Sequence, residues 1–470
     1  MNINMTGKNK KLEMKKGQAV MAVVLFMLFI GTAGVLAFSF ISLGETSSSK
    51  TILNSERSFF LSEAGNEDVS YRIIRGKTYS TTETLILDGF TATTTVITQG
   101  PLREVESIGT VQGGTRKVKT SLRSGAGSSF FYGIQVGRGG FLLENNAVVN
   151  GSIYSSGNVV MQNDAVVNGD VFIASTSHIT GNAPKTLISG SARARYISDS
   201  VISKNATSSG TLAKSTVSGH AYADRISGST ITLNAYYLTS IATSTVSGSS
   251  FPGTPAPADL PVIPLPISDS DIDAWETIAE GEGTYTGPCP YLVDDETINL
   301  GPLKINCDLL VQNDGIIILN GPVWVVGDIT LQNDAIAKLP VSYGSNSEVL
   351  IADNPSNRTT SSKIVVKNNA QTLGSGTNGS YIISISQNNS AELGGTEVAV
   401  QPQNNATNTV FYAAHGKILL ENNVGLKEAT AYIIHAKNNS VLNYETGLQN
   451  LSFSQGPSGG YTVEAWKEVE

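Results

Sequence analysis

The chain has 470 residues, of which 15% are charged and 47 are glycine, and its formal net charge is −8 at pH 7. This length allows several domains, and low charge with abundant Ser, Thr and Asn is more typical of an extracellular β protein than of a cytosolic enzyme. The chain is acidic and has no long basic stripe after residue 16, which argues against nucleic-acid binding.

The first predicted element is a membrane-spanning helix. No charged residue occurs from Ala19 to Leu43, and about 20 apolar residues suffice to cross a bilayer. A plain secretory signal fits less well, because the stretch is long and lacks an Ala-x-Ala site. The positive-inside rule places the basic end in the cytoplasm and the body outside the cell. The basic residues are Lys8, Lys10, Lys11, Lys15 and Lys16.

The helix is expected to continue out of the membrane to about residue 76. No proline occurs from Gly44 to Arg75, and charged residues alternate with apolar ones such as Leu53, Phe60 and Tyr71. An ordinary single-pass anchor with a juxtamembrane helix would show the same pattern.

The junction Lys15-Lys16-Gly17-Gln18 resembles the processing site of type IV prepilins. The stretch from Gly17 to Arg72 is similar to the N-terminus of PilX-type pilus assembly proteins, including a small-residue Glu-Ala motif at 62–67. This resemblance covers residues 8–125 and implies that a prepilin peptidase cuts after Gly17 and exposes Gln18. Many pilins carry Glu five residues after the cut, whereas this chain has Ala22.

Residues 77–128 are predicted to form a small antiparallel sheet. Residues 84–90 and 93–98 have the composition of strands, and residues 108–122 indicate a hairpin around Gly113-Gly114. A long helix on such a sheet is the pilin arrangement, so this segment agrees with the resemblance.

A three-residue signature, polar-Asn-Asn/Asp, then recurs along the chain, with one gap of 150 residues. Its copies otherwise lie 16–20 residues apart, and one step of 35 corresponds to two periods. The central residues of the copies are Asn145, Asn163, Asn313, Asn333, Asn368, Asn388, Asn404, Asn422 and Asn438.

A fixed short period of this kind indicates a solenoid. Short β-branched runs flank the copies, as in 147–154 and 165–172. We therefore predict a mainly β protein whose body is a right-handed parallel β-helix, with the repeated Asn side chains stacked as a hydrogen-bonded ladder. Two alternatives are disorder of the Asn-rich tracts and antiparallel hairpins at Asn-Gly in β-sandwich repeats.

The predicted organisation has six segments. A Pro-rich stretch from Phe251 to Pro266 precedes a short helix at Asp269–Glu280, opened by Ser268 or Asp269 as N-cap. This insertion divides two solenoid blocks. The segments are a leader (1–17), the long helix (18–76), a small β head (77–128), the first solenoid block (129–250), the linker and short helix (251–285), and the second solenoid block (286–470).

The two cysteines, Cys289 and Cys307, lie one repeat period apart, so in an exported protein we expect a disulfide between neighbouring coils. The alternative is a pair of free thiols. No catalytic, cofactor or metal motif is found among the four histidines or the scattered carboxylates. His415 and His435 are spaced to stack on adjacent coils, and the acidic run 294–296 indicates a solvated turn or a weak cation site.

The sequence thus favours a non-enzymatic, pilin-like surface protein of the type IV pilus or secretion class. Its expected partners are the membrane, prepilin peptidase, other pilins, and surface glycans or partner cells. Its expected location is the cell membrane, as a single-pass protein with an extracellular body, or a pilus. The alternative is a surface polysaccharide-active enzyme on a β-helix, which requires two or three carboxylates close together in one groove.

Overall fold

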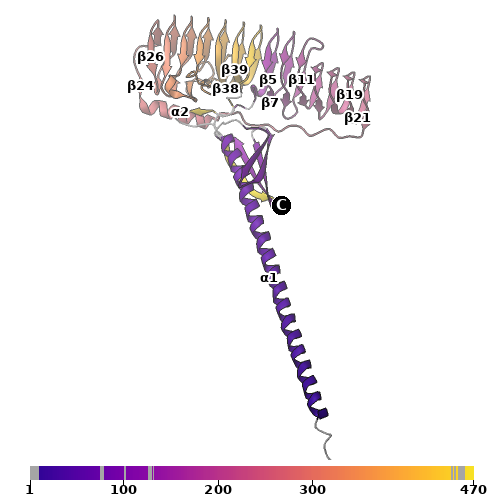
Figure 1. Ribbon diagram of the computed structural model, residues 1–470. Helices are drawn as coiled ribbons and strands as arrows, with labels where there is room; N and C mark the ends of the chain where they lie inside the picture. The colour runs from indigo at the N-terminus through magenta and orange to yellow at the C-terminus, as the bar shows by residue number, and fades with distance from the viewer. Residues whose placement is uncertain are drawn as a thin grey trace, which may run out of the picture. The chain divides into compact units, whose positions relative to one another are not determined.

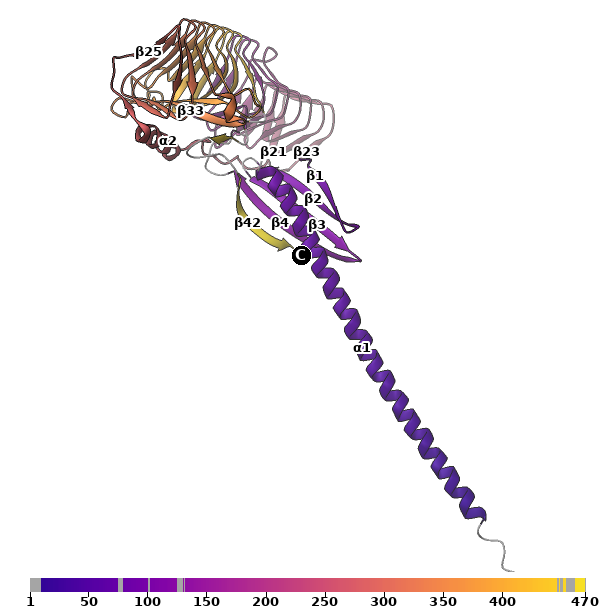
Figure 2. The ribbon, with the colours of Figure 1, turned by 60° about the vertical axis from the view of Figure 1, so that its left-hand side comes forward.

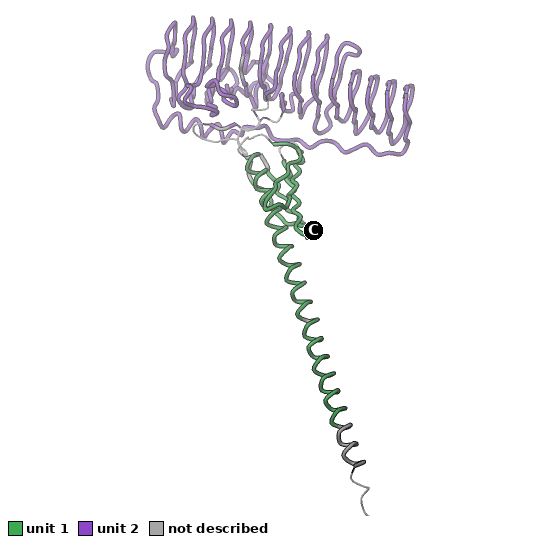
Figure 3. The backbone as a smooth tube through the Cα atoms, viewed as in Figure 1, with its two compact units in different colours: residues 1–73, 77–122, 463–470 green, residues 74–76, 123–462 purple. Residues whose placement is uncertain are grey.

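The computed structural model describes residues 10–74, 79–99, 102–124, 130, 132–445, 448, 451–453 and 461–469. The chain divides into two compact units (Figure 3). Unit 1 comprises Met1–Ile73, Lys77–Leu122 and Val463–Glu470, and unit 2 comprises Ile74–Gly76 and Arg123–Thr462.

Unit 1 combines one long helix with a five-stranded sheet (Figure 2). Helix α1 spans Lys10–Ile74. The strands, in sheet order, are β1 (Thr82–Leu87), β2 (Phe90–Gln99), β3 (Leu102–Val111), β4 (Gly114–Ser124) and β42 (Tyr461–Val469). Strands β1, β2 and β3 pair antiparallel, as the sequence predicts for this region.

The C-terminal strand β42 corrects one predicted boundary. The repeat pattern predicts that residues 286–470 all belong to the second solenoid block, but β42 lies beside β4 in the sheet of unit 1. Arg116 pairs with Glu468 at 3.0 Å, and Trp466 packs edge-on against Phe59. A strand that joins the edge of a sheet pairs with residues far away in the sequence, so a local sequence pattern does not predict where it will lie.

The C-terminal part of α1 packs on this sheet through apolar side chains such as Leu61 and through small and polar ones. A Cβ added at Gly109 would lie 2.4 Å from the Ser58 carbonyl oxygen, so helix and strand approach too closely for a larger residue. Asn66 is buried, and its Nδ2 donates to the Val105 carbonyl oxygen at 2.7 Å. The motif at 62–67 therefore lies at the contact between helix and sheet.

Unit 2 is a β-solenoid of short parallel strands, so the antiparallel sandwich alternative is wrong. Each coil contributes to three sheets, and aliphatic side chains fill the interior. No observation tests the right-handed sense of the coil, which stays a prediction. The strands of the first block are β5 (Ile134–Leu143), β6 (Val148–Asn150), β7 (Ile153–Ser155), β8 (Val159–Met161), β9 (Val166–Val167), β10 (Val171–Ile173), β11 (His178–Thr180), β12 (Leu187–Ile188), β13 (Ala192–Ala194), β14 (Tyr196–Ser198), β15 (Val201–Ile202), β16 (Ala206–Ser208), β17 (Thr211–Ala213), β18 (Thr216–Val217), β19 (Ala221–Ser227), β20 (Thr230–Ile231), β21 (Ala235–Ala242), β22 (Thr245–Val246) and β23 (Ser250–Pro252).

The second block follows helix α2 (Asp269–Glu282) and ends before the connection back to unit 1. A single 3₁₀ turn, η1, spans Val341–Tyr343. The strands are β24 (Thr284–Tyr285), β25 (Tyr291–Asp294), β26 (Thr297–Leu300), β27 (Leu303–Ile305), β28 (Leu309–Gln312), β29 (Ile316–Leu319), β30 (Val323–Val325), β31 (Ile329–Gln332), β32 (Ile336–Lys338), β33 (Asn346–Ala352), β34 (Ile364–Lys367), β35 (Gln371–Leu373), β36 (Ile382–Ser386), β37 (Val400–Gln403), β38 (Thr407–Leu420), β39 (Gly425–Ala436), β40 (Val441–Asn443) and β41 (Ser452–Phe453).

The two blocks stack in the reverse of their order in the chain. Strand β39 of the second block pairs in parallel with β5 of the first, and β40 pairs with β6. Figure 1 shows β39 beside β5 in one row of strands, with β24 and β26 towards one end and β21 at the other. Along the solenoid axis, the second block therefore precedes the first, as in a circularly permuted solenoid.

The Pro-rich segment connects the two far ends as a strap along the outside of the solenoid. Its carbonyl oxygens accept from solenoid side chains: Gln135 Nε2 donates to Pro264 and Arg193 Nη2 to Ala258, at 2.8 and 2.7 Å. Tyr154 donates to Pro261 in the same way. Proline has no N–H, so an extended Pro-rich chain offers mainly acceptors, and the solenoid face supplies the donors.

Helix α2 covers part of the same outer face. Of the two predicted N-caps, Ser268 and Asp269, the structure shows Ser268, which also forms a capping box with Asp271. The helix packs on β27, β30 and β33 and buries Ile272, Trp275 and Ala279. These side chains belong to a second apolar cluster, which also contains Trp324 and Tyr412 from the solenoid face.

Candidate functional sites

The exposed apolar half of α1 is the first candidate site. From Val20, the helix is long and apolar enough to cross a membrane, with a mean hydropathy of 2.6 in its most apolar 18-residue window. Its large apolar side chains are exposed on all sides, for example Phe29, Phe38 and Phe40. The hydroxyls of Thr32 and Ser39 donate to carbonyl oxygens one turn back, which satisfies them without water.

Gly17 and Gln18, the predicted processing residues, both lie in the backbone of α1, which begins at Lys10. The structure assigns them a helical backbone, and it does not test cleavage. The leader residues before Lys10 lie outside the described residues.

The Asn signature forms a turn with a defined backbone. In eight of the nine copies the second and third residues both have positive φ, for example 55° at Asn145 and 62° at Asn146. The residue after the pair donates its N–H back to the first residue of the copy, as from Ala147 to Glu144 at 3.3 Å. Asn tolerates this left-handed conformation better than other residues with a Cβ.

Eight of the predicted Asn side chains form one continuous ladder, in which each Nδ2 donates to the Oδ1 of the neighbouring coil. The hydrogen bonds measure 2.8–3.5 Å and all run in one direction, ending on the carboxylate of Asp294. In axial order the members are Asn163, Asn145, Asn438, Asn422, Asn404, Asn368, Asn333, Asn313 and Asp294.

Asn388 is not part of this ladder, and that prediction is wrong. It is buried, and its Nδ2 donates to the Ser361 carbonyl oxygen at 2.8 Å. Asn333, Asn368 and Asn404 lie on consecutive coils although 35 and 36 residues separate them. The step of 35 is therefore one coil with insertions, not two periods, and Asn388 belongs to such an insertion.

The two cysteines form a disulfide with a Cα–Cα distance of 5.9 Å. Cys289 lies between β24 and β25, and Cys307 between β27 and β28, which pair with them. The bond therefore joins the outermost coil of the second block to its neighbour.

The two histidines do not stack on each other. His415 contacts Glu392 at 2.5 Å and Asp269 of α2 at 3.0 Å. Burial lowers the pKa of His415, but hydrogen bonds and charge from both carboxylates outweigh it and raise the pKa overall. His435 contacts Glu144 at 2.9 Å across the joint between the blocks.

The acidic run at 294–296 forms a turn at the end of the ladder, where Asn313 and Gln312 donate to Asp294. Within the described residues of the chain, no group of three or more His, Cys, Asp or Glu side chains is arranged to hold a metal ion.

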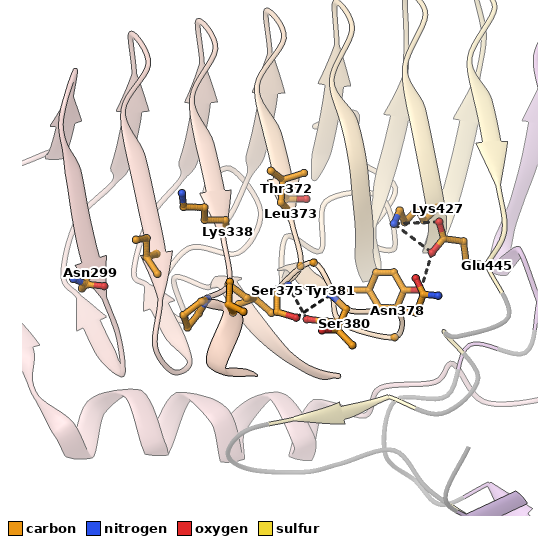
Figure 4. Close-up of a pocket in the computed structure, with 18 residues that line it drawn as sticks. Asn299, Lys338, Thr372, Leu373, Ser375, Asn378, Ser380, Tyr381, Lys427 and Glu445 are labelled. Carbon is orange, nitrogen blue, oxygen red and sulfur yellow. Dashed lines mark hydrogen bonds and ion pairs between the residues drawn. The ribbon is translucent and has the colours of Figure 1, made fainter. Parts of the chain in front are cut away.

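A pocket of about 690 Å³ opens on the outer side of the solenoid in the second block (Figure 4). Its floor comes from strands β26, β29, β32, β35 and β39, and its wall from the loops after β32 and β35. No sequence pattern predicts this pocket, because both loops belong to insertions inside coils. The lining side chains include Asn299, Ile318, Lys338, Val341, Leu373, Thr377, Asn378, Tyr381, Lys427 and Glu445.

Polar contacts hold the wall of this pocket in place. A Cβ at Gly374 would lie 1.9 Å from the Ser380 carbonyl oxygen, so the loop after β35 closes tightly on itself. The Ser375 N–H donates to Ser380 Oγ at 3.0 Å, and that hydroxyl donates to the Asn346 carbonyl oxygen at 2.7 Å. The pocket is thus shaped before any ligand arrives.

One carboxylate, Glu445, is among the lining residues, and its charge is already engaged. Tyr381 donates to it at 2.8 Å, and Lys427 Nζ lies 3.1 Å away. Burial, followed by the contact with Glu445, raises the pKa of Tyr381, so the phenol stays protonated as a donor.

No protein-family profile and no curated protein matches the chain. Among solved structures it is similar to the crystal structure of the competence-associated pilin ComZ from Thermus thermophilus, with 10% sequence identity and a TM-score of 0.29. The similarity covers 88% of this chain and 97% of that chain.

Proposed function

We propose that this chain is a membrane-anchored, pilin-like protein of the type IV pilus or secretion class that presents its solenoid on the cell surface for surface structure or adhesion. The observation that carries the proposal is helix α1, whose exposed apolar half is followed by a half packed on an antiparallel sheet. The Lys15-Lys16-Gly17-Gln18 junction and the small-residue motif at 62–67 support PilX-type membership.

The mature N-terminus is expected to begin at Gln18. Mass spectrometry of the protein from its native membrane should find Gln18 as the first residue, because the resemblance places the peptidase cut after Gly17. Gly17→Leu should leave the leader attached. Gly31→Leu is the matched control in the same helix, where nothing lies within 4 Å of an added Cβ, and its processing should be normal. Intact Met1 or cleavage beyond residue 40 in the unaltered protein would exclude the pilin-like pathway.

We also propose that the solenoid has no catalytic role. Glycoside hydrolysis uses a pair of carboxylates roughly 5–10 Å apart at one groove. Among the lining residues of the pocket, Glu445 is the only acidic side chain, and Tyr381 and Lys427 bind it. Polysaccharide cleavage by the purified protein that disappears in Glu445→Gln would establish the enzyme alternative instead.

A further inference from the structure

We propose that the pocket between β32, β35, β39 and the loop 374–381 binds an acidic saccharide through the ammonium group of Lys338. This deepens the proposed surface function and rests on it only for the exposure of the pocket outside the cell. The pocket volume of about 690 Å³ falls within the range that holds small ligands.

The lining of the pocket carries a net positive charge. The lining residues include two lysines and one glutamate, which leaves one positive charge in a chain whose net charge is −8. Lys427 is neutralised by Glu445 and lies over the Tyr381 ring, 5.0 Å from its centre. Lys338 is half-buried and has no ion pair with any described residue, so its charge is available for an anionic group.

The remaining lining residues match a sugar rather than a simple anion. Ile318 and Leu373 on the strands, with the exposed Val341 at the rim, offer apolar surface to the C–H face of a ring. Asn299, Thr377 and Asn378 supply amide and hydroxyl groups for sugar hydroxyls. A ligand with one carboxylate, several hydroxyls and an apolar ring face meets all three features of this surface.

The full-length chain in lipid nanodiscs would be titrated by calorimetry with trigalacturonic acid, a hyaluronan tetrasaccharide and sialyllactose. At least one should bind saturably. Because a hydrogen bond to a charged group is among the stronger polar contacts, the methyl ester of the bound sugar and the Lys338→Met variant should each bind about tenfold more weakly or worse.

Two control variants test whether binding depends on the positive charge at position 338 and not on the loss of any one lysine. Lys338→Arg keeps the charge and should bind nearly as the unaltered protein does. Lys367→Met removes a lysine on β34, which does not line the pocket, and should leave the affinity unchanged. An unchanged melting temperature of Lys338→Met shows that its fold is intact.

The proposal is overturned if none of the three sugars binds, if the ester binds as tightly as the acid, or if Lys338→Met binds normally. Displacement of the sugar by sodium sulfate at equal concentration would also overturn it, because the pocket would then be a simple anion site. These results are independent of cleavage at Gly17, since the titration uses purified protein in either processing state.

Discussion

At the residue scale, the repeated Asn has two separate tasks. Its backbone adopts the left-handed conformation at a coil corner, and its side-chain amide both donates and accepts along the ladder. Gly could perform only the first task, and Ala neither. This double requirement explains why Asn recurs where a turn alone would admit Gly.

Substitutions at Asn333 separate the two tasks. Asn333→Gly keeps the positive φ of 56° but loses the two side-chain hydrogen bonds to Asn313 and Asn368, and should lower the free energy of unfolding by about 1–3 kcal/mol. Asn333→Ala adds the strain of a Cβ in this conformation, roughly 1 kcal/mol more. The melting temperature should therefore be highest for the unaltered protein, lower for Asn333→Gly and lowest for Asn333→Ala. If Gly were less stable than Ala, the backbone role would be wrong.

At the element scale, helix α2 was predictable and its docking was not. Ser268, Asp271 and the apolar residues around Trp275 define the helix locally. The surface on which the helix packs includes Trp324 and Tyr412, which are far from it in the sequence. Beneath it lies a polar cluster. The half-buried Arg358 donates two hydrogen bonds to the buried Asp353, at 2.6 and 2.7 Å, and Glu276 faces the same carboxylate.

Glu276 makes the docking of α2 sensitive to pH. Burial, followed by the charge of Asp353 and a hydrogen bond with it, raises the pKa of Glu276 from 4.5 to about 9. Between these values the unfolded chain releases a proton that the folded chain keeps, so this group makes stability fall as pH rises from about 4.5 to about 9. Below that window both states are protonated and the effect disappears.

Glu276→Gln should therefore stabilise the protein at pH 8, by on the order of 1–3 kcal/mol, and have little effect at pH 4. Denaturant unfolding of both proteins at the two pH values measures this, and the contribution of His415 cancels in the comparison. Equal destabilisation at both pH values would show that Glu276 acts through packing and not through its proton.

At the scale of the whole molecule, the two solenoid blocks stack in the reverse of their order in the chain. Strand β5, where the chain enters the solenoid, pairs with β39 of the second block, and β6 pairs with β40. The joint between the blocks therefore lies in the interior of the solenoid, and the strap connects its two ends. Both blocks contribute Asn side chains to the same ladder. At the joint, Asn145 Nδ2 donates to Asn438 Oδ1 at 3.2 Å, so the ladder is unbroken there.

The joint between the blocks can be tested at Gly139. A Cβ there would lie 2.2 Å from Ile433 Cγ1 and 2.8 Å from the Tyr432 carbonyl oxygen, both on β39. Gly139→Val should overpack the joint and lower the free energy of unfolding by about 1–3 kcal/mol. Hydrogen exchange should then show β5 and β39 opening first, while β28 and β31 keep their protection.

The control is Gly281→Val in α2, where nothing lies within 4 Å of the new Cβ. Its exchange pattern should match that of the unaltered protein. Loss of protection spread evenly through the solenoid in Gly139→Val would argue that the blocks do not meet as a separable joint.

The sequence by itself determined the local chemistry of this protein: an apolar stretch long enough to cross a membrane, strands of alternating pattern, Asn-rich corners, the start of α2 and two cysteines one coil apart. These features depend on neighbouring residues and on a short period. Only the tertiary structure decided which coils meet, that β42 joins the sheet of unit 1, that Asn388 lies outside the ladder, and that the insertions shape a pocket. The physical reason is that every open coil presents a similar edge of unpaired N–H and C=O groups, so contacts such as Asn145–Asn438, 293 residues apart, leave no local trace.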